Sequence, residues 1–437
     1  MRYEKKTLAV QWHITDKCQL KCKHCYIGES PNREMPFAQI EKVLLNLQLF
    51  ADKYNYCYEF YITGGDPLLH NDWPQVFSLL KKNNLRYSIM CNPGSINDET
   101  LNLLVDNNIN SIQFSIDGLE SNHEFLRGEG SFKLLITAID KLKQKKIKSA
   151  LMFTLYDYNA DDLPRVMKMA DAMGIDRFSF DLGISIGSSL ENQLDMIGTM
   201  RLQKVLSKYI DDKTELKRNG THTFFEEKCN LLNKIRMSRG QFSCPDSREH
   251  MIYDGCQIGL TSFVIDVNGD VLGCRRLSNS VAGNILKTSF EDIWFNSSIL
   301  KKQRCKISEK EKCKDCETRN WCQGCEAYET AQALHNQSKK EPYCYDSDLL
   351  HQCNSLADNA NVDVKLEHDY LKNHILLNGI LPLVNTEEFK IEYVHLMLNT
   401  VKRKQLLENY QVYSVCNNLH QNIAKLLYYF FVQKEKL

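Results

Sequence analysis

The stretch "LAVQWHITDKCQLKCKHCY" (residues 8–26) joins an apolar, β-branched run to three closely spaced cysteines. The run at 8–15 predicts a β-strand, because apolar and β-branched residues dominate it. Cys18, Cys22 and Cys25 follow directly, with no hydrophobic run around them that could bury them in an ordinary core. The sequence therefore places three thiols at the end of the first strand.

Five further strand candidates follow along the chain, at 57–63, 86–91, 111–117, 149–156 and 176–182. Between them, apolar residues recur at the spacing of a helix face. Six alternations of strand and helix predict parallel strands joined by crossover helices, in either an open doubly wound sheet or a partial barrel. In both architectures the chemistry gathers at the carboxyl ends of the strands.

Unusual residues follow four of the predicted strands. The cysteine triplet follows the first, "GGDP" (64–67) the second, "NPG" (92–94) the third and "DG" (117–118) the fourth. Taken alone, "GGDP" or "DG" is more typical of a simple turn. Because the carboxyl ends of parallel strands share one rim, we expect all four segments to meet there.

The bulk composition limits the class of protein and its partners. At 437 residues, with 43% hydrophobic and 25% charged residues, the chain predicts a globular protein of two to four domains. Lys+Arg and Asp+Glu balance at 55 each, which argues against nucleic-acid or membrane partners. No stretch is typical of a signal peptide or a membrane span, so we expect a cytoplasmic protein. In that reducing compartment, clusters among the 17 cysteines favour metal binding over disulfides.

The triplet has the spacing C-x3-C-x2-C, which allows two kinds of metal site. A structural zinc ion needs four ligands, and His24 is the nearest candidate for the fourth. Since His24 lies between Cys22 and Cys25, its side chain would usually point away from a centre that both cysteines share. A [4Fe-4S] cluster held by only three thiolates instead leaves one iron open to a small molecule.

This spacing, followed by Tyr26 and by the three strand-end motifs, resembles the radical S-adenosylmethionine (SAM) superfamily. The resemblance implies an α/β fold with a partial (β/α)6 barrel over residues 1–190, and a reductant such as flavodoxin or ferredoxin. It implies reductive cleavage of SAM to a 5′-deoxyadenosyl radical at a [4Fe-4S] cluster bound by Cys18, Cys22 and Cys25. Asp66 stands where family members more often have glutamate. The SAM-binding residues that the resemblance implies are Tyr26, Gly64, Gly65, Asp66, Pro67, Asn92, Ser115, Asp117 and Arg127.

A second group of cysteines lies downstream, where Cys256 and Cys274 precede "CKDCETRNWCQGC" (313–325). Paired C-x2-C motifs are typical of zinc ribbons. The complete order, C-x12-G-x4-C and then four cysteines and a late one, resembles the SPASM extension of radical SAM enzymes. That resemblance implies two auxiliary [4Fe-4S] clusters in a SPASM domain over 246–350. The implied ligands are Cys313, Cys316, Cys322 and Cys344 for one cluster, and Cys256, Cys274 and Cys325 for the other.

The second of these ligand sets is one thiolate short. Relatives that fill the place use a cysteine six positions after the first, where this chain has Ser262. Either another residue completes the site, with Cys244 the nearest candidate, or one iron stays open and could bind substrate.

Three further segments complete the predicted organisation. Residues 191–245 predict a helical bridge and 351–437 a helical C-terminal region. In "FVIDVNGDVLGC" (263–274), Asn268-Gly269 predicts a hairpin, because that pair accepts the positive φ of a tight turn.

SPASM relatives with two auxiliary clusters mostly act on peptides or proteins. The resemblance therefore implies a maturase that oxidises or cross-links side chains of a ribosomally made peptide or protein. Arg275 and Arg276 would suit a carboxylate-bearing substrate, although exposed charge at a hairpin end explains them equally well. The first strand begins by residue 8, so we expect a precursor leader to be recognised by a separate partner or by the C-terminal helices.

Two other functions stay open. "WCQGCEAYETAQAL" (321–334) also resembles radical SAM enzymes of haem biosynthesis, which act on tetrapyrrole propionates. An iron-sulfur electron carrier or a zinc-stabilised interaction protein is the non-enzymatic alternative, but it leaves "GGDP" and "SIDG" (115–118) without a role. A flavin oxidoreductase has little support, because no G-x-G-x-x-G follows a strand.

Overall fold

The protein is described by a computed structural model that covers residues 6–28, 31–229, 232, 235, 256–277, 279–304 and 324–336. The predicted C-terminal helical region, 351–437, lies outside the described residues. The same holds for five of the cysteines discussed above: Cys244, Cys313, Cys316, Cys322 and Cys344.

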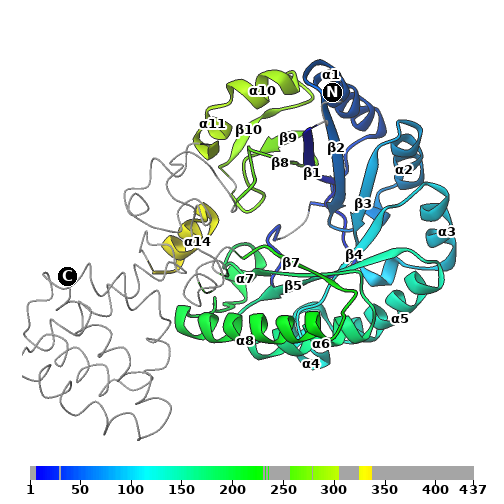
Figure 1. Ribbon diagram of the computed structural model, residues 1–437. Coiled ribbons are helices and arrows are strands. Elements are labelled where there is room, and N and C mark those ends of the chain that lie inside the picture. The colour runs from blue at the N-terminus through cyan, green and yellow to red at the C-terminus, as the bar shows by residue number, and fades with distance from the viewer. Residues whose placement is uncertain are drawn as a thin grey trace, which may run out of the picture.

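The centre of the fold is a curved sheet in which the first seven strands run parallel and pair in chain order (Figure 1). All six strands predicted from the sequence form. They are β1 (Lys6–Thr15), β2 (Tyr56–Gly64), β3 (Arg86–Met90), β4 (Ser111–Ser115), β5 (Lys148–Leu155) and β6 (Arg177–Leu182). The seventh strand, β7 (Phe224–Glu227), extends the sheet beyond β6.

Helices cover the outer, convex side of this sheet (Figure 1). They are α1 (Phe37–Tyr54), α2 (Trp73–Lys82), α3 (Asp98–Asp106), α4 (Glu120–Arg127), α5 (Ser131–Gln144) and α6 (Leu163–Ala172), with short 3-10 turns η1 (Pro67–Leu69), η2 (Pro93–Ser95) and η3 (Ala160–Asp162). Because the helices lie outside and the sheet curves around an inner space, the architecture is the partial barrel rather than the open doubly wound sheet. None of the described helices is long and apolar enough to cross a membrane.

The segment after β6 differs from the helical bridge that the sequence predicted. It contains α7 (Ser188–Glu191) and α8 (Thr199–Arg218), but β7 then joins the sheet in parallel with β6. The sequence "FFEE" of β7 has only two strongly strand-forming residues, so its pairing with β6 stabilises a strand that local preference does not predict.

The predicted hairpin forms and joins the other edge of the barrel. β8 (Ser262–Ile265) pairs antiparallel with β9 (Asp270–Leu272) and parallel with β1, and β10 (Val281–Asn284) follows β9. Of the predicted turn pair, only Gly269 has a positive φ, of 80°. The reason is that Asp266 accepts hydrogen bonds from the backbone N–H groups of Asn268 and Asp270, which closes the turn without a left-handed Asn268.

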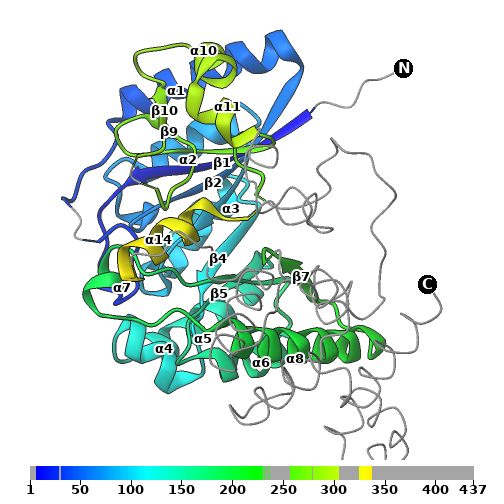
Figure 2. The same cartoon turned by 90° about the vertical axis from the view of Figure 1, so that its left-hand side faces the viewer.

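The helices α10 (Phe290–Asn296) and α11 (Ser298–Arg304) follow the hairpin, and α14 (Glu326–Asn336) is the last described element. Both views place α10 beside α1 (Figures 1 and 2). The Lys53 ammonium of α1 lies 2.8 Å from the Glu291 carboxylate, and the Asn46 amide donates to the Ile285 carbonyl at 2.9 Å. The second cysteine segment is therefore built onto the first barrel strand and its helix.

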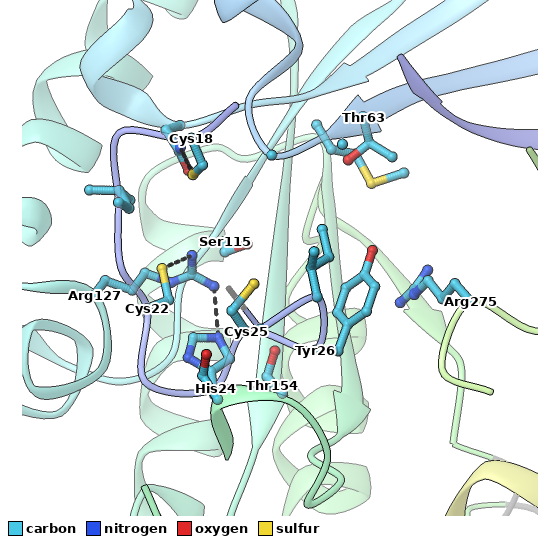
Figure 3. Close-up of a pocket in the computed structure, with 18 of the residues that line it drawn as sticks. Cys18, Cys22, His24, Cys25, Tyr26, Thr63, Ser115, Arg127, Thr154 and Arg275 are labelled. Carbon is cyan, nitrogen blue, oxygen red and sulfur yellow. Dashed lines mark hydrogen bonds between the residues drawn. The ribbon is translucent and has the colours of Figure 1, made fainter. Parts of the chain in front are cut away.

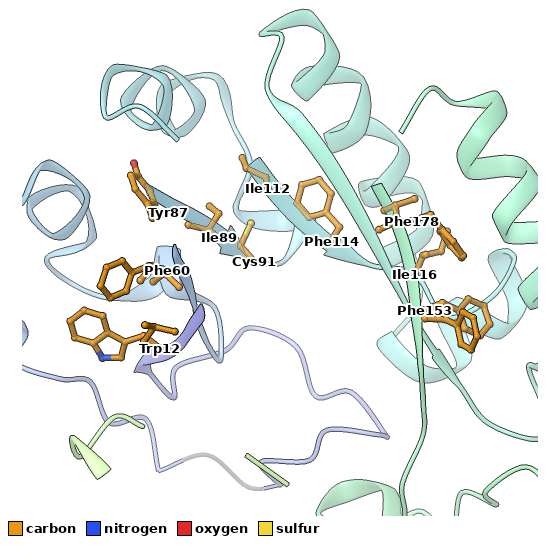
Figure 4. Packing of buried hydrophobic residues seen from close by; sticks show 14 of the residues in the cluster. Trp12, Phe60, Tyr87, Ile89, Cys91, Ile112, Phe114, Ile116, Phe153 and Phe178 are labelled. Carbon is orange, nitrogen blue, oxygen red and sulfur yellow. The ribbon is translucent and has the colours of Figure 1, made fainter. Parts of the chain in front are cut away.

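Alternation along the strands separates the core from the inner space. Successive side chains point to opposite faces of a strand. The apolar set packs in a buried cluster between sheet and helices, and includes Trp12, Phe60, Ile89, Ile112, Phe114, Phe153 and Phe178 (Figure 4). The opposite set is mainly polar and lines a cavity: Gln11, Thr63, Gln113, Ser115 and Thr154. The strands therefore present polar groups to the inner space.

Candidate functional site

A cavity of about 740 Å³ lies inside the barrel at the carboxyl ends of its strands. All six barrel strands contribute to its wall, together with the loop after β1 and the segment after β9. Its volume falls within the range of about 300–1,000 Å³ that is typical of ligand pockets. The segments after β1, β2 and β3 thus meet at this cavity as expected, whereas Asp117 and Gly118 after β4 do not line it.

The cysteine triplet lies on the loop between β1 and α1, and Cys18, Cys22 and Cys25 all line the cavity (Figure 3). Backbone hydrogen bonds fix this loop at both sides: Lys23 N–H donates to the Leu126 carbonyl at 2.9 Å, and Ser188 N–H donates to the Cys25 carbonyl at 2.9 Å. The loop is thus held between the ends of α4 and α7.

Two of the three sulfurs face N–H donors. The Asn92 amide donates to Cys18 Sγ at 3.3 Å, and the Arg127 guanidinium lies 3.7 Å from Cys22 Sγ. Burial raises the pKa of Cys22 to about 11, although Arg127 opposes this shift. N–H groups directed at sulfur suit cluster ligands, because hydrogen bonds to the sulfurs help set the reduction potential of an iron-sulfur cluster.

The arrangement of the thiols also discriminates between the two metal sites. In the described part of the chain, no group of three or more His, Cys, Asp or Glu side chains could hold a metal ion. A zinc ion requires its ligands to converge on one atom, whereas the ligands of a [4Fe-4S] cluster bind separate irons. Three thiols that line one cavity fit ligands that bind separate irons of one cluster.

A buried ion pair stands behind the triplet. Arg127 Nε lies 2.5 Å from the fully buried Asp117 carboxylate, whose other oxygen accepts from the Thr154 N–H at 2.9 Å. Burial favours the protonated form, but Arg127, His24 and His123 hold the pKa of Asp117 down at about 2. Asp117 therefore stays ionised and fixes the guanidinium beside Cys22.

His24 is neutral in this environment, because burial lowers its pKa to about 4. Its Nε2 lies 3.1 Å from an Arg127 nitrogen and so accepts a hydrogen bond. Its Nδ1 is buried and has no hydrogen-bond partner among the described residues. His24 thus supports Arg127 rather than serving as a fourth zinc ligand.

The "GGDP" motif contributes its glycines to the wall and its carboxylate to the support behind it. Asp66 is fully buried; it accepts from the Ser95 hydroxyl at 2.6 Å and the Gln19 amide at 2.8 Å. It also caps η1 by accepting from the Leu68 N–H at 3.1 Å. Burial raises the pKa of Asp66, while these hydrogen bonds oppose the shift. Asp66 therefore ties together the loops after β1, β2 and β3.

The two glycines are required by a close approach of the first loop. A Cβ at Gly64, where φ is 143°, would lie 1.9 Å from the Thr15 carbonyl oxygen. A Cβ at Gly65 would lie 2.2 Å from the Lys17 carbonyl oxygen. No side chain fits at either position without moving the loop that carries the triplet.

The residues predicted to bind SAM fall into two groups. The cavity wall contains Tyr26, Gly64, Gly65, Asn92, Ser115 and Arg127. Asp66, Pro67 and Asp117 lie behind it: Pro67 begins η1, and the two carboxylates are fully buried. These three residues do not line the cavity, and their direct contact with SAM stays a prediction.

The opposite side of the cavity is formed by aromatic, basic and polar residues. The sequence motifs single out Tyr26 and Arg275 there, but not Gln11 or the neighbouring His13. The guanidinium carbon of Arg275 lies 5.5 Å from the centre of the Tyr26 ring, and the Tyr26 hydroxyl lies 3.4 Å from His13 Nε2 (Figure 3). Burial and the nearby Arg275 lower the pKa of His13 to about 3, so His13 is neutral. Gln11 contacts both His13 and Arg275.

Of the predicted auxiliary-cluster ligands, Cys256, Cys274 and Cys325 are described, and each is partly buried. Cys274 and Cys325 pack against the main core, and Ser280 holds the backbone N–H of Cys274 at 3.1 Å. The other predicted ligands, Cys313, Cys316, Cys322 and Cys344, lie in segments outside the described residues. The two ligand sets therefore stay predictions.

Two protein-family models match the chain, one over most of the barrel and one over the second cysteine segment. The model of the radical SAM superfamily matches residues 12–170, and that of the SPASM iron-sulfur cluster-binding domain matches residues 256–317. The first range contains the triplet and the cavity wall up to β5. The second begins at Cys256 and contains the hairpin.

Curated relatives include enzymes of two kinds. The pre-heme d1 synthase of Dinoroseobacter shibae is 23% identical over 353 residues, which cover 77% of this chain and 85% of the relative. The AdoMet-dependent heme synthase of Nitratidesulfovibrio vulgaris is 24% identical over 323 residues, covering 73% and 87%. The sporulation killing factor maturation protein SkfB of Bacillus subtilis is 24% identical over 289 residues, covering 66% and 64%.

Solved structures share the fold. Streptococcus suis SuiB bound to its precursor peptide SuiA superposes with a TM-score of 0.62 at 17% identity, covering 78% of this chain and 76% of SuiB. Native anSMEcpe with bound AdoMet and the Cp18Cys peptide superposes with a TM-score of 0.59 at 19% identity, covering 77% and 94%. At these identities the likeness extends to the architecture alone.

Proposed function

The chain is a radical SAM enzyme with a SPASM domain, and on this premise we propose that it oxidises or cross-links a side chain of a ribosomally made peptide or protein. One observation carries the proposal. Three thiols, a glycine pair and polar strand-end side chains surround a single cavity that has room for a cofactor and part of a substrate.

In this proposal Cys18, Cys22 and Cys25 hold a [4Fe-4S] cluster. When bound, the cluster and SAM together supply a 5′-deoxyadenosyl radical that abstracts a hydrogen atom. Asn92 and Arg127 donate hydrogen bonds to two of the sulfurs and so fix their orientation. The other residues of the cavity position SAM and exclude water from the reacting atoms.

We assign the SAM contacts to the wall residues. Gly64 and Gly65 leave the backbone open to a ligand, and Ser115 adds a hydroxyl side chain to the same wall. Tyr26 closes the cavity on the side of the hairpin. Three residues act behind this wall by positioning it: Asp66, Pro67 and Asp117.

The SPASM domain implies auxiliary iron-sulfur clusters. We assign Cys256, Cys274 and Cys325 to one of them, with either Cys244 as the fourth ligand or an open iron. The other would use Cys313, Cys316, Cys322 and Cys344. Such clusters would accept the electron that a substrate radical loses when a new bond forms. The proposed domains are a radical SAM barrel at 1–190, a bridge at 191–245, SPASM at 246–350 and a C-terminal region at 351–437.

The peptide substrate is supported by two relatives from Bacillus subtilis, the sporulation killing factor maturation protein SkfB and the antilisterial bacteriocin subtilosin biosynthesis protein AlbA. Tetrapyrrole chemistry is the second candidate, because two heme-type synthases match this chain at similar identity over 77% and 73% of its length, against 66% for SkfB and 73% for AlbA. A flavodoxin- or ferredoxin-type reductant and a separate leader-binding partner belong to the same proposal, as does the cytoplasmic location predicted from the sequence.

The test is SAM cleavage by the anaerobically reconstituted, chemically reduced chain. We expect 5′-deoxyadenosine from the wild type and none from the variant in which Cys18, Cys22 and Cys25 are all alanine. Cys57→Ala is the matched control, because this thiol lies on β2 outside the cavity. Unchanged cleavage by the triple variant would refute the assignment of the triplet.

A further inference from the structure

The adjacent arginines after Cys274 both line the cavity but have different surroundings. Arg276 forms an ion pair with Asp181 of β6, and the Tyr328 hydroxyl of α14 donates to the same carboxylate at 3.0 Å. The charge of Arg276 is therefore balanced within the protein. Its position is fixed by the ion pair with the barrel, and α14 contacts the same carboxylate.

Arg275 has a different set of contacts. One terminal nitrogen donates to the side-chain oxygen of Gln11, which is neutral, and the guanidinium lies over the ring of Tyr26. Its buried Nε has no hydrogen-bond partner among the described residues, and no carboxylate of that set forms an ion pair with it. The charge of Arg275 helps Arg276 to lower the pKa of Asp181, but the ion pair of Asp181 is with Arg276.

A partly buried cation without a partner is costly, so its retention at a cavity wall indicates a ligand of opposite charge. The guanidinium is planar and binds a carboxylate through two parallel hydrogen bonds. Because Gln11 occupies one terminal nitrogen and Nε is buried, the other terminal nitrogen is the donor that remains for such a ligand at the cavity wall. Gln11 and Tyr26 hold the side chain in place without neutralising it.

From this difference we propose that Arg275 binds a carboxylate of the substrate, while Arg276 only connects the hairpin to the barrel. The inference rests on the proposed function and narrows its substrate to one that carries a carboxylate near the reacting group. Figure 3 shows Arg275 on the far side of Tyr26 from Cys22 and Arg127. The site therefore lies away from the thiols where SAM is assigned.

Two sources could supply the carboxylate: an acidic side chain or C-terminus of a peptide, and a propionate of a tetrapyrrole. The chemistry at Arg275 is the same for both. The experiment first tests carboxylate binding with a simple probe and then compares the two sources.

The probe experiment uses the anaerobically reconstituted full chain, phenylglyoxal as an arginine reagent and mass spectrometry of the peptide that contains Arg275. We expect saturating glutarate to slow modification of Arg275 about tenfold by occupying the site, and glutaramide, its neutral counterpart, to have no effect. Arg165 is the matched control: it is 65% exposed and pairs with Asp162, so glutarate should not protect it.

Three results would overturn the inference: equal effects of glutarate and glutaramide, protection by SAM alone, or an Arg275 that the reagent never reaches. If glutarate protects, iron coproporphyrin III and a glutamate-containing hexapeptide are compared, and the source that protects at the lower concentration is identified. 5′-Deoxyadenosine is measured on the same preparation. Cleavage without protection refutes the role of Arg275 alone, whereas protection without cleavage refutes the proposed function.

Discussion

Asp66 and Asp117 are the two carboxylates of the strand-end motifs, and both are buried behind the cavity wall. The sequence places them correctly after β2 and β4, because motif spacing follows the strand ends. It does not predict that Gln19 and Ser95 donate hydrogen bonds to Asp66, or that Arg127 forms an ion pair with Asp117. Hydrogen bonds between loops depend on tertiary contacts that no local pattern encodes.

The ion pair behind the triplet gives a prediction for stability. Asp117→Asn leaves the buried guanidinium of Arg127 without its counter-charge, so we expect the free energy of unfolding to fall by about 3 kcal/mol. Urea unfolding of the cluster-free chain measures it. The control is Asp161→Asn, an 83% exposed partner of Arg201, which should change stability by less than about 1 kcal/mol.

The same pair predicts a pH dependence. The pKa of Asp117 is about 2 in the folded chain, below its usual value of about 4 in an unfolded one. The ionised carboxylate of Asp117 therefore makes its full contribution to folding stability above about pH 4, and this contribution is lost as the pH falls towards 2. The difference in unfolding free energy between wild type and Asp117→Asn should therefore be constant from about pH 5 to 7. Below about pH 4 this difference should shrink. A difference that does not shrink would contradict the low pKa.

The hydrogen bond from Asn92 to Cys18 predicts a change in reduction potential. An N–H donor stabilises the more negative, reduced form of a cluster, so Asn92→Leu should lower the potential of the first cluster by about 60 mV, which corresponds to a tenfold change for one electron. Redox titration followed by electron paramagnetic resonance measures it. Asn83→Leu, at the end of α2, is the control, and equal potentials in all three proteins would contradict the role of Asn92.

At the scale of elements, the six barrel strands could be predicted because each combines apolar periodicity with a turn signal. β7 could not, since "FFEE" is too short and too acidic to indicate a strand without its neighbour β6. The parallel pairing of β8 with β1 joins residues some 250 positions apart, from Ala9–Ser262 to Trp12–Ile265. Such a pairing depends on the complete fold.

The loop after β2 gives a prediction at this scale. Gly65→Ala introduces a Cβ that would lie 2.2 Å from the Lys17 carbonyl oxygen, so the loop that carries the cysteine triplet must move. We expect a loss of about 1–3 kcal/mol in unfolding free energy and a lower iron content after reconstitution. Gly94→Ala is the matched control, because its Cβ would meet only the Gln19 amide nitrogen, at 4.0 Å. Equal iron contents in Gly65→Ala and the wild type would show that the close approach of Gly65 to the Lys17 carbonyl does not matter for cluster binding.

At the scale of the whole molecule, the barrel and the hairpin of the second cysteine segment share one sheet and one cavity. The barrel supplies the thiols and the glycine pair, and the segment after β9 supplies Arg275 and Arg276 to the opposite side. The sequence predicts each half by motif, but not that β8 adds to β1 and so brings the arginines opposite the triplet. The carboxylate site proposed at Arg275 and the proposed SAM site therefore border the same cavity.

The central claim is that the triplet binds an iron-sulfur cluster separate from those of the SPASM domain. Iron analysis of anaerobically reconstituted protein tests it most directly. We predict about twelve irons per chain for the wild type and about eight for the variant with alanine at Cys18, Cys22 and Cys25, since each cubane holds four. Equal iron contents in the two proteins, or zinc in place of iron in the wild type, would contradict the account.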